Sequence, residues 1–211
     1  MRISTEQLAP QLARELKPLY TVFGDEPLLA LEATDRIRAK ARAEGFVERE
    51  VLTVDSGFKW GQLAMAANSQ SLFASQKLLE LRIPSGKPGT EGSEVLREFC
   101  EALPADTVTL IYLPEIEWRA QKAGWFEALD RAGALVEAKA VPRKALPQWL
   151  ATRLKAQQQD ADAEALAFIA ERVEGNLMAA FQEVQKLALL FPAGAAQLRA
   201  GARGRARCRA L

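Results

Sequence analysis

The sequence predicts an α/β domain with a mostly parallel sheet, followed by a small helical domain. Strand-like runs alternate with segments of helical spacing, a pattern typical of parallel strands joined by right-handed crossovers. One run, TVTLIYL, is almost continuously apolar, as expected of a central strand that is covered on both faces. The strand signal stops near Pro142, while the helical period continues beyond it. We therefore expect a domain boundary there.

The strands of the first domain are expected at Leu19–Phe23, Glu50–Val54, Lys77–Ile83, Thr107–Leu113 and Ala134–Ala138. Between them, apolar residues recur at positions i, i+3, i+4 and i+7, as on one face of a helix. The two clearest sets are Trp60, Leu63, Ala64 and Ala67, and Leu96, Phe99, Cys100 and Leu103. Ser93 is the expected N-cap of the second helix, and Gly133 is the expected C′ residue after the helix that carries Trp125 and Leu129.

Three segments follow from this pattern: an α/β domain over residues 1–141, a helical domain over residues 142–196 and a tail over residues 197–211. Leu146, Leu150 and Leu154 lie four residues apart and predict the first helix of the second domain. The tail has no apolar period and holds five arginines and no acid. It is expected to be disordered, and the alternative is an arm that binds nucleic acid.

The composition excludes several classes of function. The chain has 211 residues and no histidine, so it lacks the usual general base and the commonest metal ligand. Taking the five tail arginines from 28 basic residues leaves 23 against 27 acidic ones, a net charge of −4 for residues 1–196. A body of that charge does not predict a phosphate-binding surface. No apolar run approaches the roughly 18 residues of a membrane span, no secretory signal is evident, and we expect a reduced, cytoplasmic protein without cofactor or metal.

The segment YTVFGDEPLLALEA, Tyr20 to Ala33, predicts a strand, a tight turn at Gly24 and a helix start, which is where many α/β proteins bind a nucleotide phosphate. A phosphate loop of the G-x-x-x-x-G-K-[ST] kind ends in a second glycine, a Lys and a hydroxyl residue. Counted from Gly24, those three positions are Leu29, Ala30 and Leu31. Asp25 and Glu26 would repel phosphates but suit a helix N-terminus. The third strand likewise lacks an acidic pair at its end, so we expect no ATP hydrolysis.

Leu72 and Phe73 form an adjacent pair of large apolar residues in an otherwise polar connection before the third expected strand. Two explanations fit the pattern. The pair folds back and covers the core, or it is an exposed plug that enters a pocket of a partner protein, as binding hot spots often do. The pattern alone does not separate them.

Five stretches, in order along residues 1–196, resemble the delta subunit of the bacterial DNA polymerase III clamp loader. They are YTVFGDEPLLALEATDRIR, SLFASQKLLEL, the pair Trp125 and Phe126, LPQWLATRLK and EGNLMAAFQEVQKLALLFP. The resemblance implies an AAA+-like (RecA-like) fold that has lost its ATPase parts. ATP-binding relatives carry an arginine after G-[DN]-L in the helical domain, and here Met178 stands at that place.

The resemblance also implies a role in DNA replication. Delta subunits bind the ring-shaped sliding clamp and open one of its interfaces, without an enzymatic activity of their own, inside a DNA polymerase holoenzyme. By position, the clamp-binding residues are Gln70, Ser71, Leu72 and Phe73. The other partners implied are the remaining clamp-loader subunits, which the family contacts through a third, helical domain that we expect to be missing here; DNA is reached only indirectly. The alternatives are an AAA+-type ATPase with an atypical phosphate site and a nucleic-acid binder that works through the arginine-rich tail.

Overall fold

The computed structural model describes residues 1–69, 76–173, 175–191, 197–200 and 206–209. The chain divides into two compact units, Met1–Lys139 and Ala140–Leu211. No helix in the described part combines the length and the apolar character that crossing a bilayer requires.

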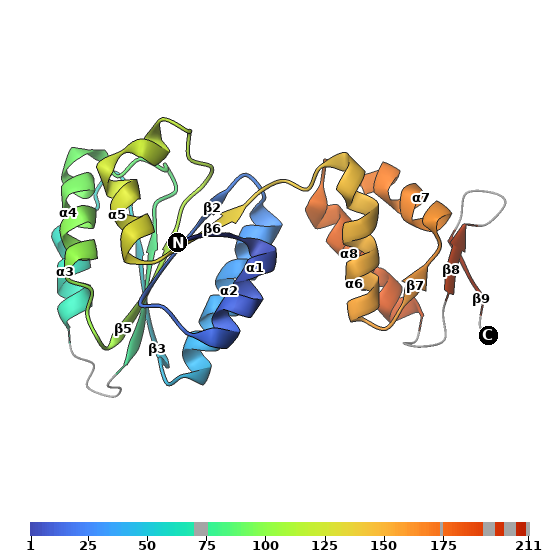
Figure 1. Ribbon diagram of the computed structural model, residues 1–211, viewed down its shortest axis with the longest axis horizontal. Coiled ribbons are helices and arrows are strands. Elements are labelled where there is room, and N and C mark those ends of the chain that lie inside the picture. The colour runs from blue at the N-terminus through green and yellow to red at the C-terminus, as the bar shows by residue number, and fades with distance from the viewer. Residues whose placement is uncertain (70–75, 174, 192–196, 201–205, 210–211) are drawn as a thin grey trace. The chain divides into compact units, whose positions relative to one another are not determined.

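The first unit alternates strands and helices along the chain (Figure 1). Its elements are β1 (Arg2–Ser4), α1 (Thr5–Arg14), β2 (Leu19–Gly24), α2 (Pro27–Ala43), β3 (Glu48–Thr53), α3 (Gly61–Asn68), β4 (Lys77–Arg82), α4 (Gly89–Glu101), β5 (Thr107–Tyr112), the 3₁₀ turn η1 (Ala120–Lys122), α5 (Gly124–Ala132) and β6 (Ala134–Ala138).

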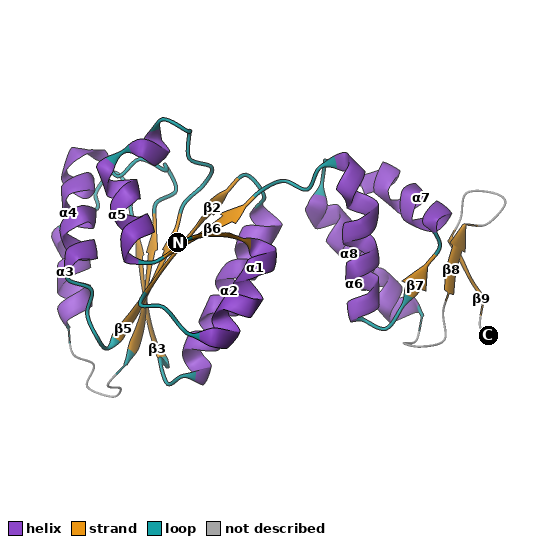
Figure 2. Cartoon of the chain, viewed as in Figure 1, coloured by secondary structure: helices purple, strands orange, loops and turns teal. Residues whose placement is uncertain are grey.

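The six strands form one parallel sheet in the order β1-β6-β2-β5-β4-β3. Helices α1 and α2 cover one face and α3, α4 and α5 cover the other, so that the sheet is the middle of three layers (Figure 2). The central strands β2, β4 and β5 are buried along nearly their whole length because both faces are covered. The predicted α/β class with a mostly parallel sheet is confirmed.

The main apolar core lies between the sheet and helices α3, α4 and α5. Phe23 from β2 meets Phe126 from α5 edge to face, with ring centroids 5.2 Å apart, and Trp125 adds a second such contact to Phe126 at 5.4 Å. Trp60 fills the space beside Gly92 of α4, where a Cβ would come within 2.2 Å of its ring. Phe23, Trp60, Trp125 and Phe126 thus pack into one core.

One expectation about an element end was wrong, and one strand was missed. Ser93 is not the N-cap of its helix: α4 begins at Gly89, and the Ser93 hydroxyl donates to the Gly89 carbonyl oxygen at 2.6 Å, inside the first turns. The edge strand β1 was missed, because three residues are too few to display a period of two. It pairs with β6 through the register Ile3↔Val136.

The second unit holds the 3₁₀ turn η2 (Arg143–Ala145), α6 (Leu146–Ala156), β7 (Asp160–Ala161), α7 (Ala163–Val173), α8 (Leu177–Leu190), β8 (Gln197–Ala200) and β9 (Ala206–Arg209). Leu146, Leu150 and Leu154 are buried in it, as their spacing predicts. The buried side chain of Gln159 donates to the carbonyl oxygens of Leu187 (3.0 Å) and Phe191 (2.8 Å) and so ties β7 to the end of α8.

Two short strands are described within the tail, and the expected disorder of residues 197–211 as a whole stays a prediction. β8 pairs in parallel with β7 and antiparallel with β9, with Leu198 opposite Cys208. No sequence pattern predicts this pairing, because the tail has no sustained alternation of apolar and polar residues.

Candidate functional site

The four predicted clamp-contacting residues, Gln70, Ser71, Leu72 and Phe73, lie outside the described residues. The structure does describe both ends of the connection that carries them. Helix α3 ends at Asn68 with Ser69 as its C-cap, and β4 begins at Lys77. The end of α3 and the start of β4 lie at the same end of the strands (Figure 1). The two explanations for Leu72 and Phe73, that they cover the core or that they form an exposed plug, therefore both stay predictions.

A buried ammonium group joins these two ends. Lys77 is only 5% exposed. Its Nζ donates to the carbonyl oxygen of Ser69 and to the Ser69 hydroxyl, each at 2.8 Å, and also to the carbonyl oxygen of Ala66. The nearest carboxylate oxygen belongs to Glu50, at 3.8 Å. In the sequence, Lys77 stands only at the start of an expected strand, and the one signal of its role is a lysine directly before an apolar run.

The turn at Gly24 is the second candidate site, since it stands where phosphate loops stand. Gly24 has φ +145°, and a Cβ there would lie 2.0 Å from the Ala138 carbonyl oxygen. The Gly24 N–H donates to the Pro114 carbonyl oxygen at 3.4 Å, and the Glu26 N–H donates to that of Ala138 at 3.1 Å. The glycine therefore allows a close approach of two strands rather than an approach of phosphate.

At the start of α2, too, a backbone N–H group already has a protein acceptor. The Glu26 side chain is the N-cap and accepts the N–H of Leu28 at 3.2 Å, and Pro27 has no N–H to offer. Burial raises the pKa of Glu26, while the Leu28 hydrogen bond acts in the opposite direction. A phosphate loop needs amides directed at its ligand. Here the amides of residues 24, 26 and 28 already have protein acceptors, and the acceptor of the last is a carboxylate.

Strand β4, the third of the strands expected from the sequence and the one expected to lack an acidic pair at its end, contains a single buried acid. Glu80 is 2% exposed and receives paired hydrogen bonds from Arg38 (2.7 and 3.0 Å) and Arg49 (2.5 and 2.9 Å). Burial works against its ionisation, but the hydrogen bonds from Arg49 and Arg38 outweigh it and lower the pKa of Glu80 to about 2. A carboxylate with both oxygens held by two guanidinium groups is suited to joining α2, β3 and β4, not to moving protons.

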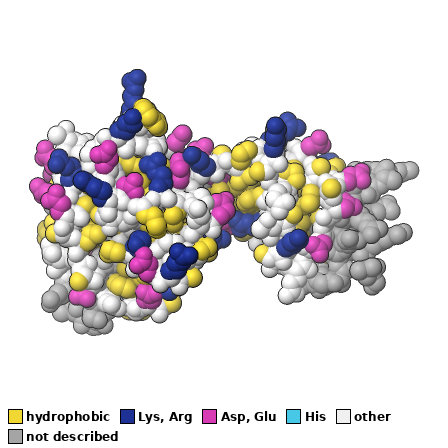
Figure 3. Space-filling view, viewed as in Figure 1, with side chains coloured by type: hydrophobic (Ala, Val, Ile, Leu, Met, Phe, Trp, Pro, Cys, Tyr) yellow, Lys and Arg dark blue, Asp and Glu magenta, His cyan; other side chains and the backbone are white. Residues whose placement is uncertain are grey.

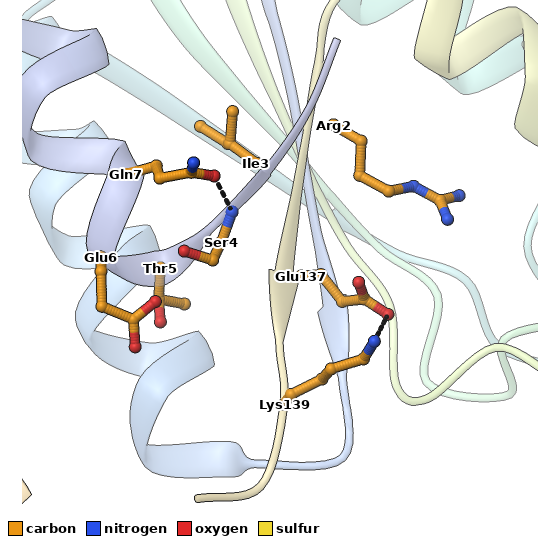
Figure 4. Close-up of a pocket in the computed structure, with 8 residues that line it drawn as sticks. All are labelled: Arg2, Ile3, Ser4, Thr5, Glu6, Gln7, Glu137 and Lys139. Atoms are coloured by element: carbon orange, nitrogen blue, oxygen red, sulfur yellow. Dashed lines mark hydrogen bonds and ion pairs between the residues drawn. The ribbon is translucent and has the colours of Figure 1, made fainter.

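A shallow pocket of about 210 Å³ opens beside β1, the start of α1 and the end of β6 (Figure 4). Its polar groups are largely engaged with one another. The Ser4 N–H donates to Gln7 Oε1 at 2.9 Å, and Lys139 pairs with Glu137 at 3.2 Å. Arg2 lies over the rings of Phe23 and Phe126, 5.7 and 5.9 Å from their centroids. This mixture of paired charges does not form a phosphate site.

The distribution of charged side chains over the surface likewise does not indicate a nucleotide phosphate site. On the face shown in Figure 3, positive and negative side chains are interspersed over the described residues and do not gather into one basic patch. In the second unit, Met178 is 38% exposed in the first turn of α8, where ATP-binding relatives are expected to carry an arginine. Its thioether has no charge to offer a phosphate.

Comparison with known proteins agrees with the resemblance found in the sequence. The family model for the DNA polymerase III delta subunit matches residues 20–139. The chain is 31% identical over 194 residues to the DNA polymerase III subunit delta of Escherichia coli, covering 92% of this chain and 57% of that protein. It is 32% identical to the subunit delta of Haemophilus influenzae, covering 90% and 56%. The chain thus spans little more than half the length of these relatives.

Solved structures support the fold. The clamp-loader delta protein of Bacillus subtilis matches with a TM-score of 0.69 at 20% identity, over 92% of this chain and 60% of that one. A variant of the RuvB protein of Thermotoga maritima matches with a TM-score of 0.52 at 14% identity, over 92% and 64%. The fold is therefore that of the AAA+ (RecA-like) proteins, and the chain belongs to the DNA polymerase III delta subunit family.

Proposed function

We propose that this chain is a clamp-loader subunit that binds the ring-shaped sliding clamp in DNA replication through Gln70, Ser71, Leu72 and Phe73, and that it does so without hydrolysing ATP. The observation that carries the proposal is the family match over residues 20–139, which includes this segment. The engaged amides around Gly24 and Glu26 support the nucleotide-independent part, because a phosphate would have to displace protein acceptors.

Opening of the clamp follows from binding energy alone in this proposal. A protein shifts a closed ring toward an open one only by as much as it binds the open form more tightly. Leu72 and Phe73 would anchor the α/β unit in a pocket of the clamp, and the rest of that unit would contact the open form better than the closed one. The other clamp-loader subunits are proposed as further partners.

The test is titration of a purified bacterial sliding clamp with the wild-type chain and with the Leu72→Ala, Phe73→Ala variant, both checked for folding by circular dichroism. Hot-spot residues typically lose about 2 kcal/mol or more on truncation to Ala, so the dissociation constant should rise by roughly thirtyfold or more. The matched control is Leu189→Ala, Leu190→Ala, which truncates two apolar residues of α8 that are 87% and 68% exposed. This control should bind like the wild type.

Two results would contradict the proposal. A folded wild-type chain that does not bind the clamp would refute the function. A double variant that unfolds would show that Leu72 and Phe73 cover the core, as in the alternative drawn from the sequence. Opening itself is measured separately, as the rate at which a clamp closed on circular DNA is released when the chain is added.

A further inference from the structure

The basic and acidic residues of the second unit are segregated along the chain. Residues 140–159, which include η2 and α6, hold four basic residues and no acidic one. Residues 160–191 hold two basic residues and six acidic ones. With six residues of each sign, residues 140–191 are neutral as a whole, while the first helix of the unit carries a surplus of positive charge.

Polar side chains form a stripe along the outer side of α6. Four exposed residues recur at intervals of four, four and three positions along η2 and α6: Lys144, Gln148, Thr152 and Lys155. This spacing places them on the side of the helix opposite to its three buried leucines. Figure 1 shows α6 on the near side of the second unit, with α8 behind it. We call these four residues the α6 stripe.

The two lysines of the α6 stripe have no carboxylate partner among the described residues, unlike Lys186 of α8, whose Nζ pairs with Glu183. Lys155 lies in the last turn of α6, where the helix dipole favours a positive charge. Lys144 lies just before the first turn, where the dipole disfavours one. The stability of α6 therefore explains one of the two lysines and not the other.

The residue types and the length of the α6 stripe suit a row of phosphate groups. Lysine and glutamine side chains are among those that donate to DNA phosphates. The Thr152 hydroxyl already donates to the Gln148 carbonyl oxygen at 2.9 Å, so Thr152 adds a small polar surface without charge between the lysines. Lys144 and Lys155 are eleven residues apart, which is about 16 Å along a helix. That length matches about five phosphates of one strand of duplex DNA.

Other partners of negative charge fit the α6 stripe less well. A helix that lies on a membrane exposes its apolar face, whereas the leucines of α6 are buried. Single-stranded nucleic acid is bound largely by stacking of bases on exposed aromatic rings. The ring beside the stripe, Trp149, is half-buried and has the Arg153 guanidinium over it, 4.7 Å from its centroid. A protein partner is held mainly by large anchor residues, and the middle of the stripe offers none.

We propose that the α6 stripe binds the phosphate backbone of duplex DNA, so that the second unit contacts DNA directly. The inference goes beyond the proposed function, because neither clamp binding nor the residues at 70–73 enter into it. The resemblance implies that DNA is reached only indirectly, and the alternative drawn from the sequence assigns nucleic-acid binding to the tail. Here the binding element is a helix of the described part of the chain.

The test is titration of a short, fluorescently labelled DNA duplex with the intact chain, followed by anisotropy at several salt concentrations. The main variant is Lys144→Gln, Lys155→Gln. We expect about tenfold weaker binding at low salt, and a slope of log K against log salt that is smaller by about 1.8, because each phosphate contact contributes about 0.9. The matched control is Lys59→Gln, Lys87→Gln, which removes two exposed lysines of the first unit and changes the net charge equally. Its slope should equal that of the wild type.

A second variant tests the α6 stripe without removing a lysine. Thr152→Glu places a carboxylate between Lys144 and Lys155 and should weaken DNA binding severalfold, since like charges repel. Gln185→Glu, at an exposed position of α8, adds the same charge away from the stripe and should leave the affinity unchanged. Circular dichroism checks the folding of every variant, and Thr152→Glu decides the question if the double lysine variant does not fold.

The contribution of the tail is measured with Arg203→Gln, Arg205→Gln, and loss of DNA binding in this variant alone would overturn the inference. An equal loss in the stripe variant and in the Lys59→Gln, Lys87→Gln control would also overturn it, because only net charge would then matter. So would a wild-type chain that does not bind duplex DNA, or one that prefers a single strand of the same length. Clamp binding by the stripe variant should be unchanged, which separates this inference from the proposed function.

Discussion

At the scale of single residues, the structure contains buried charged groups whose partners the sequence pattern did not predict. Glu80 and Lys77 both lie in β4, a strand whose pattern predicted an apolar core element, and both are nearly inaccessible to solvent. A strand pattern indicates which positions are buried, but it does not reveal which distant side chain compensates a buried charge. Arg38 and Arg49 reach Glu80 from 42 and 31 residues away along the chain. Such partners become visible only when the topology is known.

Glu80 gives the prediction at this scale. Glu80→Gln removes the charge that two guanidinium groups share and leaves Arg38, with 21% of its side chain exposed, facing a neutral amide. Breaking a buried pair by removing one partner typically costs 3–5 kcal/mol, and because Arg49 can turn toward water we expect the lower end, about 3 kcal/mol. Urea denaturation at pH 7 measures it. A loss below about 0.5 kcal/mol would show that the cluster contributes nothing to stability.

The same residue predicts a pH dependence whose sign is fixed by the direction of the pKa shift. The pKa of Glu80 falls from 4.5 to about 2 on folding, so the unfolded chain binds the proton more readily. The stabilisation is complete above about pH 5 and is lost progressively as the pH falls toward 2. The wild type should therefore lose more free energy of unfolding over this range than Glu80→Gln. Parallel pH profiles would contradict the assignment.

At the scale of elements, the inner strands were predicted with their starts, whereas of the two edge strands β3 was predicted two residues late and β1 was missed. The predicted strands beginning at Leu19, Lys77, Thr107 and Ala134 start where the structure starts them, because a strand buried on both faces leaves a continuous apolar run. β1 was missed for its brevity, and the start of α4 was misplaced because Ser93 satisfies its hydroxyl within the helix. The predicted contact residues at 70–73 stay a prediction, since they lie outside the described residues.

The turn between β2 and α2 gives the prediction for this scale. Its amides at Gly24, Glu26 and Leu28 already have protein acceptors, and the acceptor of the Leu28 N–H is the Glu26 carboxylate. Addition of millimolar Mg²⁺ and ATP should therefore leave the thermal unfolding midpoint unchanged. Ligand at about 100 times its dissociation constant would add about 2.7 kcal/mol of stability. An upward shift of several degrees would revive the alternative of an atypical ATPase.

At the scale of the whole molecule, the chain combines the AAA+ fold with a turn between β2 and α2 whose backbone amides donate to protein acceptors instead of to a phosphate. The fold class follows from the alternation of strands and helices, and the family follows from stretches distributed over the first two thirds of the chain and beyond. What the pattern of residues could not supply is the partner: nothing in periodicity or charge distinguishes a clamp-binding segment from a loop that covers its own core. The resemblance supplied that hypothesis, and a direct map of the interface tests it.

The most direct test of clamp binding through residues 70–73 is amide hydrogen exchange, measured by mass spectrometry on the intact chain alone and saturated with a bacterial sliding clamp. We predict that protection on binding is strongest in peptides covering residues 69–77, and that it is the same with and without Mg²⁺ and ATP. Protection confined to other regions, such as the exposed Trp118 or the strands Gln197–Ala200 and Ala206–Arg209, would contradict the account.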